Sequence, residues 1–540
     1  MKKTQFLNII DTDVLVVGSG GAGLFAAIAA KTEGADVLVV GKGRPGRANN
    51  TAISGGVFAA VTGSKGTRDT DSLHISDTLA GGRFINNPEM VSIMVKGASE
   101  QVENLLKYGV YLQRKEGKDF WVIHVPGHSV PRHLFTKNSF GTDFTIPIAS
   151  FACKKNIKFL SRVFVERLLR GANGEIRGAL ICDPDKKGLI LVNAKAVVLA
   201  TGGAGRIYSR TNNAPGSTGD GYSLGLRLGI PLIDMEFVQF YPTLLFEEGL
   251  PNSLVAYEVF IFRGKARLFN SMGEDVALRN NITDPSSMTR DMLTRAIATE
   301  VMNGRGVNGG VILDVSQIPA KKLEKYQRFL PKSLNGRTRF VISPAVHHCM
   351  GGLLVSPKGE TKIEGLYSAG EVNGGAHGAN RLGGNALTET WVYGNLTGVL
   401  AARFAQKNQM PAQGEDIDNI YREIGKNFAG NGSESIPSIG RELKDSMWQN
   451  GGIIRTEESL TSLVKTITGL RARLNLCAVE NYKDLVKKLE LKNMLLVGDA
   501  IAQSALIRQE SRGAHFRADF ADEGGDEWIK NIAVRPDGQN

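Results

Sequence analysis

Residues 346–390 carry the side chains of this chain that are best suited to chemistry. Two adjacent histidines, His347 and His348, are followed by Glu371 and then by Arg381, which stands in a turn crowded with glycines. Glycine has no Cβ, so backbone N–H groups in such a turn can approach a bulky anion closely. Arg381 stays charged near neutral pH and can clamp a carboxylate through its planar fork. This pattern favours a ligand site over the alternative, a glycine-rich surface loop with an exposed arginine.

Such a site needs elements that hold its glycine turns in place. Residues 13–43 contain two apolar stretches separated by a glycine turn, which predicts strand, turn, helix and strand. Gly18, Gly20 and Gly23 form GxGxxG at the junction of strand and helix, where free N–H groups can receive a pyrophosphate. Lys42 stands after the second strand, where an acid that binds a ribose hydroxyl of NAD is expected. Its presence there disfavours NAD.

The segment GLYSAGEVNGGAHGANRLGGNAL (365–387) resembles one shared by the flavoprotein subunits of fumarate reductase and succinate dehydrogenase and by L-aspartate oxidase. VHHCMGG (346–352) is most similar to soluble fumarate reductases, and the likeness runs from Asp13 to about Arg517. The resemblance implies an α/β fold with a Rossmann-like FAD-binding domain, an inserted α+β capping domain and a C-terminal helical domain. The expected boundaries are 1–229 and 341–411 for the FAD-binding domain, 230–340 for the capping domain and 412–540 for the helical domain.

The same resemblance predicts FAD as the cofactor and names the residues that contact it. Glu371 would accept a hydrogen bond from a ribose or ribitol hydroxyl, and N–H groups at a helix start would stabilise negative charge on the reduced ring. Together with Gly18, Gly20, Gly23 and Lys42, the predicted contacts are Asn49, Ser54, Gly55, Gly56, Ala200, Thr201, Gly202, Asp220, Glu371, Asn385, Ala386 and Leu387.

Asn49 also bears on how FAD is held. In succinate dehydrogenases a histidine in the segment that corresponds to RANNTAISGGVFAA (47–60) bonds covalently to FAD, and Asn49 falls in its place. We therefore expect non-covalent FAD. In the family the covalent link favours succinate oxidation, so its absence favours reduction of a double bond.

Two arginines match catalytic positions of the family. Arg290, in SSMTRDMLTRAIATEV (286–301), matches the arginine that supplies a proton, and Arg263 matches a relay arginine. A guanidinium does not normally titrate, so this role needs a relay that returns the proton. In the alternative interpretation, Arg290 lies on a helix surface and pairs with Asp291 or Asp284.

The substrate residues follow the family only in part. His347 and Arg381 match a histidine and an arginine that hold carboxylates. In MEFVQFYPT (235–243), however, Tyr241 replaces a substrate histidine, and Phe260 stands where the relay glutamate belongs. On a regular strand Glu258 would lie on the same face as Phe260, so we do not expect it to substitute. The identity of the carboxylic acid therefore stays open.

Two further motifs have alternative interpretations. PGHSVPRH (126–133) resembles a segment of aspartate oxidase and soluble fumarate reductases; its His128, Arg132 and His133 either line the flavin domain or are surface residues with ordinary partners. Near the C-terminus, ESRGAHFRADF (510–520) either meets a partner or attaches the helical domain to the flavin domain.

Composition limits the partners and the location. The chain has 540 residues, of which 42% are hydrophobic, and no apolar run long enough to span a membrane. Its four cysteines are widely spaced, which predicts no metal or iron–sulfur site. A net charge of +11 without a basic run and interleaved aromatics favours anionic ligands or an acidic protein over nucleic acid. With no signal-peptide pattern at the start, we expect a cytoplasmic protein, or a peripheral one held at the inner face of the membrane through a partner.

The sequence thus predicts an enzyme that reduces the C=C bond of fumarate or a related unsaturated carboxylate. Hydride would come from flavin N5 and a proton through Arg290, with electrons from an iron–sulfur or other redox protein. The alternative is an amino-acid oxidase of the L-aspartate oxidase type. Retention of Arg290, Arg263 and Arg381 disfavours a non-enzymatic subunit kept for assembly.

Overall fold

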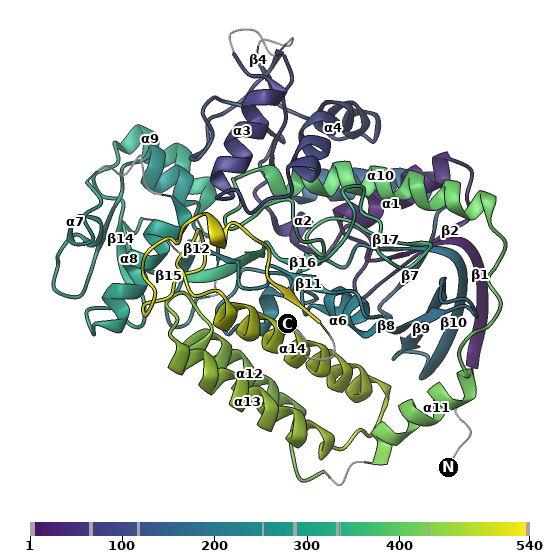
Figure 1. The fold of residues 1–540 in the computed structure, drawn as a ribbon. Helices are drawn as coiled ribbons and strands as arrows, with labels where there is room; N and C mark the ends of the chain where they lie inside the picture. The colour runs from purple at the N-terminus through teal and green to yellow at the C-terminus, as the bar shows by residue number, and fades with distance from the viewer. Residues whose placement is uncertain are drawn as a thin grey trace.

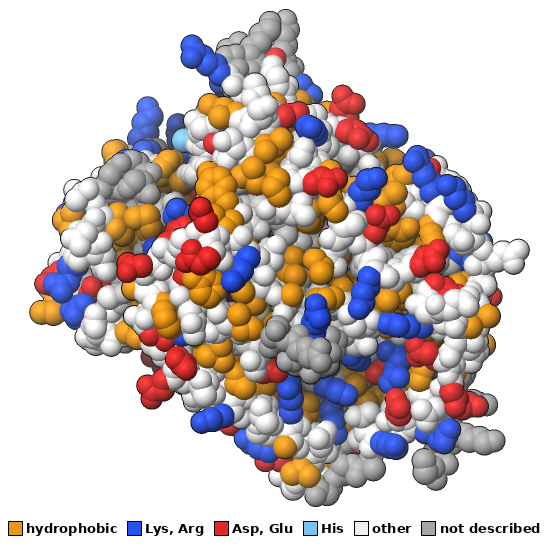
Figure 2. All heavy atoms as spheres, viewed as in Figure 1, with side chains coloured by type: hydrophobic (Ala, Val, Ile, Leu, Met, Phe, Trp, Pro, Cys, Tyr) orange, Lys and Arg blue, Asp and Glu red, His pale blue; other side chains and the backbone are white. Residues whose placement is uncertain are grey.

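The computed structural model describes residues 6–63, 68–115, 119–250, 253–283, 289–330, 334, 336–429 and 432–535. These residues form a large mixed sheet with covering helices, a smaller antiparallel sheet, and a group of long C-terminal helices (Figure 1). Within these ranges no helix is long and apolar enough to cross a membrane. On the face drawn in Figure 2, Lys and Arg side chains are interspersed with Asp and Glu side chains.

The large sheet begins with the strand, turn, helix and strand that the sequence predicts. β1 (Phe6–Val17) leads through the glycine turn into α1 (Gly21–Thr32) and β2 (Val37–Gly41). β1 pairs in parallel with β2 on one side and with β10 (Gly188–Leu199) on the other. The strand order is β7-β2-β1-β10-β9-β8, with β17 also beside β10; the other bounds are Lys158–Ser161 for β7, Phe164–Arg170 for β8, Ile176–Asp183 for β9 and Leu366–Ser368 for β17.

The carboxyl ends of β1, β10 and β17 meet at one edge of this sheet. Val17 lies opposite Leu199, and Leu199 lies opposite Ser368, all in parallel register. The turns that follow the three strands therefore start side by side. In open α/β sheets this is the edge at which ligands bind.

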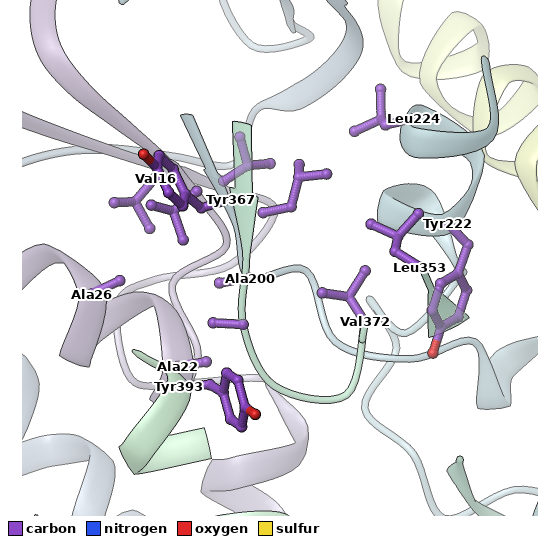
Figure 3. Packing of buried hydrophobic residues seen from close by; sticks show 14 of the residues in the cluster. Val16, Ala22, Ala26, Ala200, Tyr222, Leu224, Leu353, Tyr367, Val372 and Tyr393 are labelled. Carbon is purple, nitrogen blue, oxygen red and sulfur yellow. The ribbon is translucent and has the colours of Figure 1, made fainter. Parts of the chain in front are cut away.

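Helices α1 and α10 (Asn385–Lys407) pack against each other over the sheet (Figure 1). Gly398 permits this close approach, because a Cβ at that position would lie 2.3 Å from the carbonyl oxygen of Ala26. Figure 3 shows the apolar side chains beneath, which come from strands, helices and the turns between them. The other elements of this region are α2 (Asn50–Ile53), α3 (Asp71–Gly81), α4 (Pro88–Lys107), α5 (Thr142–Lys154), α6 (Asp220–Arg227), β3 (Val57–Ala59), β4 (Arg114–Lys115), β5 (Asp119–Phe120) and β6 (His133–Phe135).

The smaller sheet has the strand order β12-β15-β14-β13, and each neighbouring pair is antiparallel. Most of its buried apolar side chains form a cluster of their own, whereas those at one end of β12 and β15 pack with the cluster of the large sheet: Val238, Phe240, Val346 and Cys349. This agrees with an α+β insertion, although the boundaries 230–340 stay a prediction. The elements are β12 (Val238–Leu245), a π-helix (Glu258–Arg263), β13 (Arg267–Phe269), α7 (Val276–Arg279), α8 (Arg290–Met302), β14 (Val311–Asp314), α9 (Ala320–Tyr326) and β15 (Arg339–Cys349).

The C-terminal part is helical, with α12, α13 and α14 packed together (Figure 1). After α14, β18 (Ala533–Val534) pairs with β11 (Leu232–Ile233), which follows α6 in the chain. The remaining bounds are Gly352–Leu353 for β16, Ile417–Lys426 for α11, Ile436–Asn450 for α12, Glu457–Asn475 for α13 and Tyr482–Ile507 for α14.

The closing motif is buried and bonded within the chain. Arg517 donates to the carbonyl oxygen of Ala505 and to the carboxylate of Asp519. His515 Nδ1 accepts from Arg455, and Arg512 pairs with buried Glu510. These side chains hold the C-terminal segment in place and do not face a partner.

Candidate active site

A cavity of about 1190 Å³ begins where β1, β10 and β17 end and reaches the small sheet. Most of the predicted cofactor and substrate residues line it, although they come from distant parts of the sequence. The lining includes Gly18, Gly20, Lys42, Asn49, Ser54, Gly55, Ala200, Thr201, Gly202, Asp220, Tyr241, Arg263, Arg290, His347, Glu371, Arg381, Ala386 and Leu387.

Gly23, Gly56 and Asn385 do not line the cavity. A Cβ on Gly23 would lie 1.9 Å from the carbonyl oxygen of Gly18, so this glycine lets α1 pack against the first turn. Gly56 has φ +64° and packs against the backbone of Phe140. The Asn385 side chain faces α3, where it bonds with His74 and Thr78. These three residues shape the backbone around the cavity and do not form its wall.

The glycine turn after β1 fits a dinucleotide. Gly18 has φ +120°, and a Cβ there would lie 2.1 Å from the carbonyl oxygen of Ala200. The turns after β1 and β10 therefore touch, and only glycine permits this contact. α1 starts directly after them at Gly21, so its N-terminal N–H groups and partial positive charge face the same cavity.

Lys42 and Asp220 form an ion pair at the end of the cavity next to β2. Lys42 Nζ lies 2.7 Å from Asp220 Oδ2, 2.7 Å from Glu490 Oε1 and 2.6 Å from Thr218 Oγ1. Burial opposes the charged form of Lys42, but Asp220 and Glu490 outweigh it and raise its pKa. A residue of the C-terminal helix α14 thus fixes a lysine of the cavity wall.

Glu371 lies at the end of the turn after β17, as the sequence predicts. One carboxylate oxygen accepts from the Cys349 N–H at 3.1 Å, and the other accepts from Asn50 Nδ2 at 3.2 Å. Burial raises the pKa of Glu371. The carboxylate is held rigidly and borders the cavity, so it can accept from a hydroxyl of a bound ligand.

The N-terminus of α10 also faces the cavity. Gly384, Ala386 and Leu387 are all part of the wall. Among the described residues, the N–H groups of these three have no protein acceptor. Three free donors at a helix start favour a partly negative ligand atom beside them.

At the small-sheet end of the cavity, two guanidinium groups share one neutral acceptor. Arg381 Nη2 lies 2.8 Å from Gln239 Oε1, and Arg290 Nη1 lies 3.2 Å from the same atom. Arg381 is buried, and its Nε has no partner among the described residues. Burial and then the charge of Arg290 lower the pKa of Arg381 to about 9. A buried cation without a carboxylate partner makes this a site for an anion.

Arg290 faces this cavity, as predicted, and pairs with Glu258. Arg290 Nη2 lies 2.8 Å from Glu258 Oε1, and the guanidinium lies over the Tyr241 ring at 5.2 Å. Burial opposes its charge, but Glu258 together with Tyr257 and Tyr241 outweighs burial and raises the pKa of Arg290. Asp291 points elsewhere and accepts from Asn380, which contradicts the surface pairing with Asp291; Asp284 lies outside the described residues.

The expectation that Glu258 would lie on the same face as Phe260 is corrected here. That expectation assumes a strand, but residues Glu258–Arg263 form a π-helix. Residues two apart on a helix point to different faces. Phe260 is therefore buried in the core of the small sheet, whereas Glu258 reaches the cavity and accepts from Tyr241 Oη at 2.6 Å. A carboxylate therefore lies beside Arg290, but it comes from position 258, two residues before the position at which the family glutamate was expected.

Tyr241 and His347 lie next to this pair. Their ring centroids are 5.3 Å apart, and His347 Nδ1 lies 3.0 Å from Asn212 Nδ2. Burial and the neighbouring charges of Arg290 and Arg381 lower the pKa of His347 well below its ordinary value, so the imidazole is neutral. Burial and then Glu258 raise the pKa of Tyr241. Both side chains offer neutral hydrogen-bonding groups next to two cations.

Arg263 lines the same cavity, but its contacts differ from those expected of a relay. Its Nη2 donates to the carbonyl oxygen of His124 at 3.1 Å. In the part of the chain that the structure describes, no side-chain hydrogen bond links Arg263 to Glu258 or Arg290. A role for Arg263 in proton transfer remains a prediction.

With this geometry established, comparison with known proteins identifies the family. The sequence matches the FAD binding domain family over residues 13–387 and the C-terminal domain of fumarate reductase flavoproteins over residues 440–540. The chain belongs to the fumarate reductase and succinate dehydrogenase flavoprotein family. It is thus an FAD-dependent oxidoreductase of a class that acts on CH–CH bonds, and the fold class expected from the sequence is confirmed.

Individual members of the family match almost the whole chain. It is 37% identical to an uncharacterized FAD-dependent oxidoreductase of Methanocaldococcus jannaschii, covering 97% of this chain and 96% of the relative. It is 35% identical to a fumarate reductase (CoM/CoB) subunit of Methanothermobacter marburgensis, covering 97% of each. The structure of the flavoprotein of E. coli quinol fumarate reductase has a TM-score of 0.89 at 27% identity, covering 98% of this chain and 95% of that one.

Two residues of the site were not predicted from the family resemblance. Gln239 lies in the family motif MEFVQFYPT, and its place two residues before Tyr241 on a strand was the available signal. Asn50 follows Asn49 and donates to Glu371, while its Oδ1 accepts from Ala214 N–H. Neither residue type is distinctive by itself, because amides are common on polar surfaces. Only the fold shows that both amides bridge separate segments of the wall.

Proposed function

We propose that this flavoprotein reduces the C=C bond of fumarate or a related unsaturated carboxylate. The observation that carries this proposal is that buried Arg381 and half-buried Arg290 share the single neutral oxygen of Gln239. A substrate carboxylate would supply the negative charge that Arg381 lacks, whereas Arg290 already pairs with Glu258. Their position beside the cavity with the FAD-binding turns would put the anion next to the cofactor site.

The residues of this chain have separable roles in the proposed reaction. Arg381 and neutral His347 hold the carboxylate, and Gln239 keeps Arg381 and Arg290 at a fixed spacing. FAD, when bound and reduced, supplies the hydride. Arg290 delivers a proton, and Glu258 at 2.8 Å is placed to return one to it. Tyr241 donates to Glu258 and so fixes the carboxylate that faces Arg290.

The small-sheet unit at 230–340 would act as a cap over the substrate. It contributes Tyr241, Glu258 and Arg290 to the cavity wall, whereas Arg381 comes from the segment 341–411 of the expected FAD-binding domain. Asp291 at the start of α8 also accepts from Asn380, next to Arg381. Excluding water from such a site strengthens its electrostatic interactions. The segment therefore has both the residues and the contacts that a cap requires.

Electrons would come from a separate redox protein, an iron–sulfur protein being the expected type. The four cysteines of this chain lie far apart in sequence, at 153, 182, 349 and 477. Two facts support a multi-protein system: the M. marburgensis relative is named as one subunit of a reductase, and the net charge of +11 suits an acidic partner. Any association with the inner face of a membrane would be through that partner.

The test is anaerobic reoxidation of dithionite-reduced protein, followed at the flavin absorbance band. We expect fumarate, or another unsaturated acid from a panel, to reoxidise the flavin within seconds. Reoxidation by fumarate would mean that Tyr241 and Glu258 replace the family's usual histidine and glutamate. No response to any acid, together with flavin reduction by L-aspartate under the same conditions, would replace this proposal with the oxidase.

A further inference from the structure

A buried cluster with no role in the proposed reaction contacts Gly383, two residues after Arg381. It consists of His128, Arg132 and His133, whose exposures are 4%, 1% and 0%. The sequence left open whether these residues line the flavin domain or lie on the surface, and the structure excludes the surface. Asp69 and Asp77 bound the cluster on the side of α3, and the turn after Arg381 bounds it on the other. Burying so many polar groups costs free energy, so we looked for the segment that the cluster holds in place.

The hydrogen bonds of Arg132 fix the proton of His128. Arg132 pairs with Asp69 at 2.8 Å and Asp77 at 2.5 Å, and its Nη1 also lies 2.8 Å from His128 Nδ1. A guanidinium can only donate, so His128 Nδ1 must accept and the ring proton must be on Nε2. His128 Nε2 then donates to the carbonyl oxygen of Gly383, 2.9 Å away. Burial lowers the pKa of His128 well below its ordinary value, which agrees with a neutral ring.

His133 bonds to the same carbonyl oxygen. Its Nε2 lies 2.8 Å from Gly383 O, and its ring lies edge-to-face against that of His128, with centroids 4.4 Å apart. His133 Nδ1 lies 3.3 Å from the carbonyl oxygen of Ile123, but a neutral ring has one N–H, and the shorter contact of Nε2 places the proton there. Two imidazoles therefore donate to the carbonyl oxygen of Gly383. A Cβ on Gly384 would lie 2.6 Å from the His133 ring, so the glycine is required at this contact.

Peptide geometry then sets the direction of the next donor. In a trans peptide the C=O of one residue and the N–H of the following residue point in opposite directions. The histidines hold Gly383 O on their side, which turns the Gly384 N–H away from them. Gly384 is part of the cavity wall, and its N–H has no acceptor within the described residues. A Cβ at Gly383 would lie 3.8 Å from Arg290 Nη2, so this peptide adjoins the anion site.

From this geometry we infer that His128 and His133, braced by Arg132, are positioning residues that present the Gly384 N–H to a carboxylate oxygen bound at Arg381. The inference rests on the proposed function, because it assigns a further donor for the same anionic substrate. It also gives the buried cluster a purpose: His133 borders the cavity and His128 does not, and both act on the anion through the peptide between Gly383 and Gly384. A fixed peptide N–H costs no reorganisation when the anion enters.

The test compares two amides at each histidine. Gln places its Nε2–H near the position of His Nε2 and can reach Gly383 O, whereas Asn is one methylene shorter and cannot. The readouts are the dissociation constant of malonate, measured by perturbation of the oxidised flavin spectrum, and the dissociation constant of FAD from the apoprotein. We expect H128N and H133N to weaken malonate binding about tenfold. H128Q and H133Q should stay within about twofold of the parent, and the FAD constant should change little in all four.

Three outcomes would overturn the inference. Equal malonate affinity in the Asn and Gln variants would mean that the donor to Gly383 is irrelevant. Weakened FAD binding with unchanged malonate binding would assign the N–H to the cofactor. A parent protein that binds neither malonate nor fumarate would refute the proposed function and this inference together, which distinguishes it from the other two results.

Discussion

Glu258 and Arg290 form an ion pair with a distance of 2.8 Å between Oε1 and Nη2, and they come from the first residues of two different helices. The π-helix directs Glu258 into the cavity, and α8 starts at Arg290. Tyr241 holds the other carboxylate oxygen at 2.6 Å. The position of the carboxylate thus depends on a helix type that its sequence context did not reveal.

Replacing Glu258 by Gln should lower turnover by about a hundredfold or more, because general acid–base groups contribute effects of that size. FAD content should not change, since the residue belongs to the substrate end of the cavity. Turnover with the best unsaturated acid, measured with a reduced viologen as electron donor, checks this. Glu247→Gln is the matched control: Glu247 pairs with Arg337 at 2.7 Å on the same small-sheet unit, away from the cavity. Equal turnover in the two variants would remove Glu258 from the proton path.

Replacing Arg381 by Lys should impair substrate binding more than the FAD site. Lysine cannot form the planar two-point contact with a carboxylate, and a buried lysine near Arg290 would lose its proton more readily. We expect the KM for the acid to rise by about a hundredfold, with FAD content retained. Arg305→Lys provides the comparison, because Arg305 pairs with Glu300 at 2.7 Å in the small-sheet unit. An unchanged KM in Arg381→Lys would contradict carboxylate binding at this position.

The fold class could be predicted from the sequence because its signals are local. The GxGxxG turn, the apolar strand before Ala200 and the amphipathic helix after Asp220 each depend on nearby residues. The parallel register of β1, β10 and β17 then brings their turns together, which accounts for the many wall residues that were predicted. The return of the last strand, β18, to β11 has no such local signal, because only two residues pair.

The site residues that were missed depend on tertiary geometry. The spacing of Glu258 from Arg263 matched no expected pattern. Only the π-helix directs the Glu258 side chain to a different face from that of Phe260. Gln239 carries no charge, so nothing in its type showed that it would lie between two arginines. The buried position of His128 acquires a meaning only through its contact with Gly383, which lies 255 residues further along the chain.

Buried neutral histidines should make the protein sensitive to acid. Burial lowers the pKa of His74 from 6.5 to about 4 and that of His133 to about 3. Below pH 6.5 the unfolded chain binds protons that the folded chain does not, so this contribution to stability is present above 6.5 and is lost as the pH falls towards these values. The shifted pKa of His74 alone should lower the free energy of unfolding by about 2 kcal/mol as the pH falls from about 7 to about 5.

Urea unfolding of the FAD-loaded protein at the two pH values measures this loss. His74→Gln can still bond with Asn385, as His74 does at 2.9 Å, but it cannot titrate, so its loss should be smaller than that of the parent. His124→Gln is the control, because His124 is exposed and bonds only to a backbone oxygen among the residues that the structure describes. If both variants lost as much stability as the parent, the buried imidazole of His74 would not be the cause.

FAD should be released when the protein is precipitated with acid. Asn49 cannot form the histidyl bond, and its amide is already used: Oδ1 accepts from Ala52 N–H at 2.9 Å and caps α2. After precipitation we expect the flavin in the supernatant and a colourless pellet without flavin fluorescence. A fluorescent polypeptide band in a denaturing gel would show a covalent link at another residue and would contradict this prediction.

Glu490→Gln should weaken FAD binding even though Glu490 lies on the C-terminal helix α14. Its carboxylate holds Lys42 Nζ at 2.7 Å, and Lys42 pairs in turn with Asp220 at the cavity wall. Removing one of two partly exposed partners should cost about 0.5–1 kcal/mol, which corresponds to an FAD dissociation constant about two- to fivefold higher. Fluorescence quenching on titration of the apoprotein with FAD measures it. Glu434→Gln removes an equally close partner of Arg473 and should leave the constant unchanged. The same constant in both variants would mean that the helical domain contributes nothing to the cofactor site through Lys42.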